Sequence, residues 1–263
     1  MLGTLVDVTL TAADTRSAQQ AFDAAFGEVE RIQQLMSAHH PASEVSRLSE
    51  QAHLRPMRVH PDTLAVLRLA LALHAESGGI FDVATGDVMA GAGRVPALAR
   101  ARGEERGTSA DILIDADGQV RFARALHLDL GGVAKGYAMD CAARSLQAHG
   151  INSALLNAGG DMLAIGQENH TVHLRFASGV KAVAVLRKGA FAASCHAGAL
   201  SPGAHVDARD ARTLQRRDTI AVQAPTAAEA DALTKVAMVC GATADRLCAM
   251  RRAQWRAFDY FAA

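Results

Sequence analysis

Apolar residues recur every three or four positions along several stretches of this chain, which is the pattern of amphipathic helices. The ends of these stretches carry residues that start and stop helices. Pro61 begins one of them and Gly78-Gly79 follows its last turn, while Thr226 and Glu229 have the spacing of a capping box. The pattern predicts helices over residues 14–36, 62–77, 133–149 and from 225 onward, with a short helix behind Ser43.

Other segments alternate between apolar and polar residues, as strands with one buried face do. Asp117-Gly118, between two of them, signals a hairpin turn. Helices and strands follow one another in mixed order, which favours an α+β fold of mixed, largely antiparallel sheets flanked by helices. We expect residues 1–263 to form one domain or two interlocked subdomains. The predicted strands cover residues 2–10, 111–114, 120–122, 126–128, 154–157, 171–177, 181–187, 219–223 and 254–258.

The charge balance argues against polyanionic partners. The 263 residues include 27 basic and 27 acidic side chains, so neither nucleic acid nor an anionic membrane is an expected partner. No signal peptide and no run of ~20 apolar residues is visible, so we expect no stable membrane insertion and a cytoplasmic location for the chain as written. The cysteines at 141, 195, 240 and 248 have no C-x-x-C spacing and are expected to be reduced.

The most informative stretch runs from Asp129 to Gly136, where a strand-like segment meets the start of a helix through Gly131-Gly132. Unpaired N–H groups at a helix start and the helix dipole favour an anion, and glycines allow a positive φ and the close approach of a ligand. Lys135 adds a positive charge, and it is one of four lysines among the 27 basic residues. These features favour a diphosphate-binding turn. The alternative is an ordinary strand-to-helix turn with a solvated lysine.

Further polar residues are candidates for a site. Asp231, Thr234 and Lys235 share one face of the helix that begins at 225, because they are spaced at i, i+3 and i+4. They line a site or simply face water. The adjacent pair His39-His40 has no third metal ligand nearby and is more typical of a surface. A polar segment around His205 is read as a loop.

Taken together, motifs spread over nearly the whole chain make it resemble the FAD:protein FMN transferases, the ApbE family. Their number and order are more specific than any one of them alone. The motifs are Gly3-Thr4, residues 36–48 from Met36-Ser37 to Leu48, residues 79–83 with Phe81-Asp82, residues 129–137, Asn157-Ala158-Gly159-Gly160-Asp161, and residues 224–233.

The resemblance implies an enzyme that splits FAD at its diphosphate, releases AMP and attaches FMN through a phosphoester to a Thr or Ser hydroxyl of a target flavoprotein, with Mg²⁺. By motif position, Asp129 and Lys135 match FAD contacts that serve catalysis, and the Gly131-Gly132 turn lies against the cofactor. The Gly132 carbonyl and Asp231 match magnesium ligands, and oxygen donors suit this ion. His205 resembles the family's histidine near the acceptor hydroxyl, a candidate base.

The sequence departs from the family pattern at several positions. Leu2 stands where a methionine usually packs on the flavin, and His39 where an aromatic residue often stacks on it. The magnesium-binding threonine expected four residues after Asp231 is Lys235, preceded by Thr234. Either Thr234 replaces that ligand, or Lys235 supplies part of the ion's charge and weakens the dependence on magnesium. Many relatives are periplasmic or membrane-anchored and carry a lipoprotein leader; none is visible in the chain as written, so we expect a form without one, unless a leader was removed.

Other classes of function stay open on the sequence alone. The first is a FAD-binding or magnesium-dependent FAD pyrophosphatase relative that transfers nothing to protein. The second is a thiol hydrolase using Cys195 with His196 or His205, although neighbours in sequence rarely form such a pair. The third is a scaffold without catalysis.

Overall fold

The computed structural model describes residues 3–98, 106–195, 205–214 and 218–259. Within these residues, six strands form one sheet in the order β1-β4-β5-β8-β11-β12, and each neighbouring pair is antiparallel. The antiparallel α+β prediction is therefore confirmed, and the C-terminal strand lies at a sheet edge. The strands are β1 (Val6–Leu10), β4 (Ala154–Ala158), β5 (Asp161–Ile165), β8 (Gly189–Cys195), β11 (Asp218–Ala224) and β12 (Gln254–Asp259).

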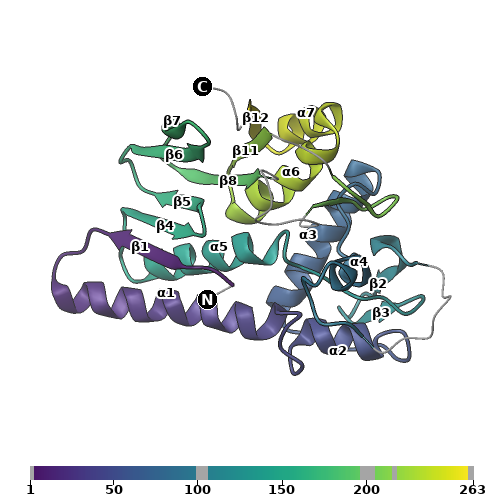
Figure 1. Cartoon of the computed structure of the whole chain (residues 1–263). Helices are drawn as coiled ribbons and strands as arrows, with labels where there is room; N and C mark the ends of the chain where they lie inside the picture. Colours follow the sequence, from purple (N-terminus) through teal and green to yellow (C-terminus); the bar gives the residue numbers. More distant parts are fainter. Residues whose placement is uncertain (1–2, 99–105, 196–204, 215–217, 260–263) are drawn as a thin grey trace.

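Helices cover one face of this sheet in two layers (Figure 1). The helices α5 (Ala134–Ala148) and α6 (Ala227–Val239) pack against its strands, and α1 (Thr15–Met36) packs against α5. Alternate strand residues face the other side. There the hairpin of β6 (His170–Phe176) and β7 (Gly179–Leu186) covers a smaller apolar cluster.

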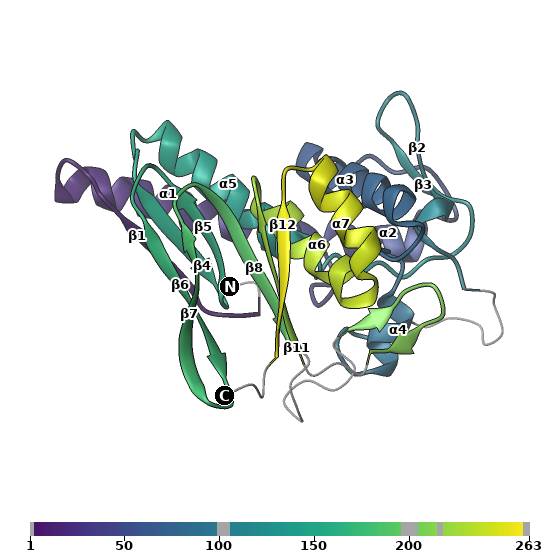
Figure 2. The ribbon, with the colours of Figure 1, turned by 90° about the horizontal axis from the view of Figure 1, so that it is seen from above.

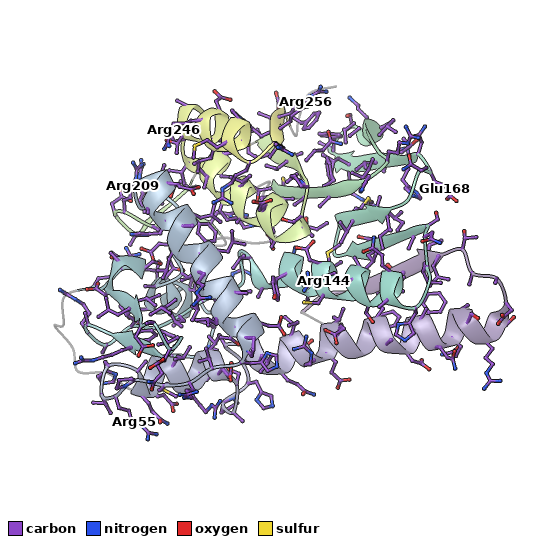
Figure 3. All side chains as sticks on the ribbon, turned by 180° about the vertical axis from the view of Figure 1, so that it is seen from behind. Arg55, Arg144, Glu168, Arg209, Arg246 and Arg256 are labelled. Carbon is purple, nitrogen blue, oxygen red and sulfur yellow. The ribbon has the colours of Figure 1, made fainter. Side chains whose placement is uncertain are left out.

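A second group of elements lies beyond the C-terminal end of α1 (Figures 1 and 2). It is tied to the sheet side at the end of α7 (Gly241–Met250), where Arg251 pairs with Glu76 of the second group and with Glu229 of α6, each at 2.8 Å. Arg246, labelled in Figure 3, donates to the Glu76 carbonyl. These elements are α2 (Glu44–Gln51), α3 (Pro61–Ser77), α4 (Gly86–Gly91), the 3₁₀ turn η1 (Ser109–Asp111), and the hairpin of β2 (Ile112–Ile114) and β3 (Val120–Phe122). Helix α7 itself packs against α6 and β12 and touches α3.

The helix ends follow the predicted signals. The Ser43 hydroxyl caps α2 by accepting from Ser46 N–H at 3.0 Å. Gly78 ends α3 in the left-handed region at φ 63°, a conformation that glycine adopts without a steric penalty. Thr226 caps α6, but the Glu229 carboxylate accepts from the Thr226 hydroxyl at 3.0 Å and thus departs from the expected reciprocal bond to the cap backbone.

Other predictions were wrong or incomplete. Residues 126–128 join no strand; they are held by single hydrogen bonds, such as Leu128 N–H to the Ser49 hydroxyl at 3.0 Å. The segment after His205 is a short hairpin, β9 (Val206–Asp207) with β10 (Arg212–Thr213), rather than a loop. Helix α7 and strand β8 were not predicted, since both are rich in alanine and small residues that give no clear period.

In the part of the chain that the structure describes, no helix combines the length and the apolar character needed to cross a membrane.

Candidate functional site

A cavity of about 610 Å³ is lined by residues from the C-terminal end of α1, the start of α5 and the second half of α6. Its size is typical of small-molecule sites. Its lining is mainly apolar and also includes several ionisable candidates from the sequence, namely His39, Asp129, Lys135, His205 and Lys235. The apolar lining includes Ile32, Met36, Ile80, Phe81, Val83, Met89, Val95, Leu130, Leu214 and Met238.

The turn from Asp129 to Gly132 forms one wall of this cavity. Asp129 is fixed by its own N–H, which donates to Val83 O at 2.8 Å, and its carboxylate accepts from Gly131 N–H at 2.8 Å. Burial raises the pKa of the Asp129 carboxyl, against the lowering effect of the Gly131 N–H. Neither Gly131 nor Gly132 has a positive φ, so that part of the prediction was wrong. A Cβ at Gly131 would lie 3.0 Å from the Asp129 carboxylate. The group that comes close to this glycine is therefore a side chain of the same turn.

Gly136, at the end of the same motif, has a packing role. A Cβ there would overlap the Ala227 carbonyl and lie 2.6 Å from Ala228 N. The glycine therefore lets α5 touch the N-terminus of α6. On the next turn of α5, the Asp140 carboxylate accepts from the N–H groups of Ala227 and Ala228 at 2.8 and 3.0 Å. The motif thus positions α6, which carries Asp231 and Lys235, against the start of α5.

Two lysines that line the cavity meet one buried carboxylate. Asp231 is 1% exposed; its Oδ1 accepts from Lys235 Nζ at 2.7 Å, and its Oδ2 lies 3.5 Å from Lys135 Nζ. Lys135 also donates to the Asp161 carboxylate, which accepts from Ala193 N–H through its other oxygen at 3.1 Å. Asp231 therefore pairs with Lys235 across one helical turn, and because Asp231 and Thr234 are buried, the alternative that this face points to water is excluded.

The Lys235 ammonium is enclosed by oxygen atoms. Besides the Asp231 carboxylate, it donates to the hydroxyls of Ser194 at 3.1 Å and Thr234 at 3.0 Å. These two hydroxyls are 2.8 Å apart, and the Thr234 hydroxyl also donates to the Asp231 carbonyl at 2.7 Å. Thr234 is fully buried, so it supports the ammonium from behind and does not line the cavity.

The protonation of this cluster follows from its burial and its charges. Burial lowers the pKa of Lys135, while Asp231 opposes that shift. Burial acts to raise the pKa of Asp231, but the ammonium groups of Lys235 and Lys135 outweigh it and hold the pKa below its ordinary value. Asp231 is therefore ionised at neutral pH.

Ser194 and Asp161 were missed as site residues. Asp161 ends the Asn157–Asp161 motif, for which the sequence predicts no role of the carboxylate, and Ser194 belongs to a small-residue strand without a motif of its own. Strands β5 and β8 are neighbours in the sheet, which places both side chains beside α6. Only the sheet order could have revealed this.

The other candidates are distributed around the same cavity. His205 and His39 both line it, although they are far apart in sequence. Asp207, two residues after His205, is 2% exposed and faces Arg209, whose guanidinium lowers the pKa of the Asp207 carboxyl. Figure 3 labels Arg209, which belongs to the hairpin of β9 and β10. Leu2 and His196 lie outside the described residues.

The residues present do not fit a divalent ion in this arrangement. Among the described side chains, no group of three or more His, Cys, Asp or Glu is placed to hold a metal. The Asp231 Oδ2 atom is buried without a hydrogen bond, as a ligand atom would be, but Lys135 faces it and Lys235 occupies the other oxygen. A magnesium ion there would meet two ammonium groups at close range, which repel it.

Similarity to known proteins identifies the family of this chain. Residues 2–258 match the sequence model of the ApbE family. The chain belongs to the ApbE family. A curated FAD:protein FMN transferase of Treponema pallidum is 30% identical over 160 residues, covering 56% of this chain and 44% of that protein. One of Vibrio cholerae is 26% identical over 174 residues, covering 63% and 51%. The chain thus matches about half the length of these curated ApbE relatives.

Solved ApbE structures show the same fold. The flavin transferase ApbE of Vibrio cholerae superposes with a TM-score of 0.78 at 21% identity, covering 96% of this chain and 89% of that one. The ApbE protein of Thermotoga maritima gives a TM-score of 0.84 at 20% identity, covering 97% and 90%. The antiparallel sheet with its helices is therefore an ApbE fold over nearly its whole length.

Proposed function

We propose that this protein is a FAD:protein FMN transferase, which attaches FMN to a Thr or Ser hydroxyl of an acceptor flavoprotein. The observation that carries the proposal is a cavity whose lining combines many apolar side chains with the ammonium groups of Lys135 and Lys235. Family membership and the names of the curated relatives support the same reaction.

The two kinds of lining suit the two chemical parts of FAD. Apolar side chains such as Met36, at the end of α1, provide surface for a planar flavin ring, and His39 adds a ring at the same end of α1. The diphosphate would lie beside the Gly131-Gly132 turn and against the two ammonium groups. Lys135 is a compact charge there, suited to phosphate oxygens.

The reaction joins the FMN half to the acceptor. The acceptor hydroxyl oxygen attacks the phosphorus of the FMN half, and its proton passes to the His205 imidazole, which lines the cavity. The bond from that phosphorus to the bridging oxygen breaks, and AMP leaves with that oxygen and its electron pair. Catalysis of this kind depends mainly on positioning and on neutralising charge, which we assign to Lys135 and Lys235.

The resemblance also implies magnesium, which would neutralise phosphate charge. Because Asp231 already holds two ammonium groups, the donor set of this chain does not fit that ion, and the proposed reaction includes no step through it. The function of Asp231 in this proposal is to hold the lysines in place.

An assay with FAD and a candidate acceptor protein tests the function. We expect a fluorescent acceptor band on a denaturing gel together with released AMP. Free FMN and AMP without a labelled acceptor would instead identify a FAD pyrophosphatase. Absence of AMP would contradict both enzymes and favour a binding protein or scaffold.

A further inference from the structure

The proposed function uses the charge of Lys235 but does not explain why buried oxygen atoms surround its ammonium group. Its contacts are a carboxylate oxygen and two hydroxyl oxygens, all on buried residues: Asp231 is 1%, Ser194 6% and Thr234 0% exposed. Carboxylate and hydroxyl oxygens are also the donors that hard divalent cations prefer. The protein therefore provides a cation site, and a side chain of the same protein fills it.

The stem of Lys235 occupies the adjacent space. A Cβ built on Gly132 would lie 3.5 Å from Lys235 Cγ and 3.7 Å from its Cε, so the side chain runs directly past the glycine turn. It spans the gap between Gly132 and Asp231, the two positions that the family pattern assigns to an ion. The ammonium and an ion at this point exclude each other by volume as well as by charge.

The cluster presents its positive side to the cavity. The side chains of Lys135 and Lys235 are 24% and 29% exposed, whereas those of Asp161 and Asp231 are 9% and 1% exposed. The carboxylates lie behind the ammonium groups, as ligands lie behind a metal ion. An anion in the cavity therefore meets the lysines first.

We propose that Lys235 is the permanent cation of this site, a phosphate-binding residue whose fixed ammonium neutralises the diphosphate of a bound dinucleotide without a divalent ion. Asp231, Ser194 and Thr234 act as positioning residues that hold the ammonium at this point. The inference rests on the proposed function for the identity of the dinucleotide, FAD.

The test is FAD binding by fluorescence titration, in chelator and in magnesium, for wild type, Lys235→Thr and Lys188→Thr. Lys188 is an exposed lysine on the turn before β8, so it controls for the loss of one positive charge. Wild type and Lys188→Thr should bind FAD equally well in both solutions. Lys235→Thr should bind about 10- to 100-fold more weakly in chelator, the loss expected for one charge-assisted contact, and should recover in magnesium.

A thermal melt of the same proteins gives a readout independent of FAD. Magnesium should raise the melting temperature of Lys235→Thr, in which Asp231 has lost its close cation, and leave wild type unchanged. If Lys235→Thr does not fold, Lys235→Gln keeps a hydrogen-bond donor without the charge and takes its place in both measurements.

The outcomes separate the inference from the function. Wild type that binds FAD in magnesium but not in chelator, or that is stabilised by magnesium alone, overturns the role of Lys235 even if transfer is observed. Wild type that binds FAD in chelator but labels no acceptor contradicts the transferase and supports Lys235. Wild type that binds no FAD in either solution contradicts both.

Discussion

At the scale of single residues, the lysines are the most informative side chains. The chain has four, and two of them, Lys135 and Lys235, line one cavity from different helices. Arginine supplies most of the other basic charge, and Lys135 and Lys235 place compact charges close to buried oxygen atoms. The sequence alone drew attention to both lysines. It could not show that they share Asp231, because that contact depends on how α5 packs against α6.

The first prediction concerns His205 as the base for the acceptor. His205→Ala should slow acceptor labelling by ~10²–10⁴-fold, which is the usual contribution of a positioned base, and leave FAD affinity nearly unchanged. His173→Ala, an exposed histidine on β6, is the matched control and should behave as wild type. Undiminished labelling by His205→Ala would place the base elsewhere.

The second prediction concerns the glycine turn. A Cβ at Gly132 would make only ordinary contacts, the nearest at 3.5 Å to Lys235, so Gly132→Ala should fold normally. The larger side chain of Gly132→Val would extend into the space proposed for the diphosphate. We expect it to weaken FAD binding by at least about tenfold, which corresponds to ~1.4 kcal/mol. Unchanged affinity in a folded Gly132→Val protein would show that the diphosphate lies elsewhere.

At the scale of elements, hydrophobic periodicity and helix-end signals were sufficient to predict the limits of the helices with clear amphipathic faces. Helices α1, α3 and α5 lie within a residue or two of their predicted limits. Prediction failed where tertiary contacts replace local ones. The sequence predicts a strand at residues 126–128, yet the hydrogen bonds of residues 127–129 join Gly86, Ser49 and Val83 rather than a partner strand. Alanine-rich α7 and β8 carry too little contrast between apolar and polar positions to be recognised.

The contact between α5 and α6 can be tested at Gly136. Gly136→Ala places a methyl group against the Ala227 carbonyl, and overpacking of this kind typically costs about 1–3 kcal/mol of unfolding free energy. Gly27→Ala in α1 is the control, because no atom lies within 4 Å of its Cβ; alanine there should add roughly 0.5–1 kcal/mol. Denaturant unfolding measures both changes. Equal stability of Gly136→Ala and wild type would refute the close contact.

The same helix pair should give the protein a pH-dependent stability. Burial raises the pKa of Asp140 from its ordinary 3.8 to about 6, although the N–H groups of Ala227 and Ala228 act in the opposite direction. Because folding raises this pKa, the protonated carboxyl stabilises the folded protein below a pH of about 3.8, and this stabilisation is lost as the pH rises through about 6. The unfolding free energy of wild type should therefore fall over this range relative to Asp140→Asn. Parallel pH profiles for the two proteins would contradict the assignment.

At the scale of the whole molecule, the antiparallel sheet, its helices and the second group around α3 build one cavity from segments distant in sequence. The family resemblance anticipated the fold and several cavity residues, namely His39, Asp129, Lys135 and His205. It did not anticipate Ser194, because nothing in the sequence brings β8 next to α6. The organisation of residues 1–263 as one domain, the individual site roles and the acceptor stay predictions.

The most direct test of the central claim is the stoichiometry of transfer. Purified protein, FAD and an acceptor flavoprotein are incubated together; AMP is quantified by chromatography, and the acceptor is analysed by mass spectrometry. The account predicts one AMP released for each FMN found in phosphoester linkage on a Thr or Ser side chain. AMP release matched by free FMN, with an unmodified acceptor, would contradict it.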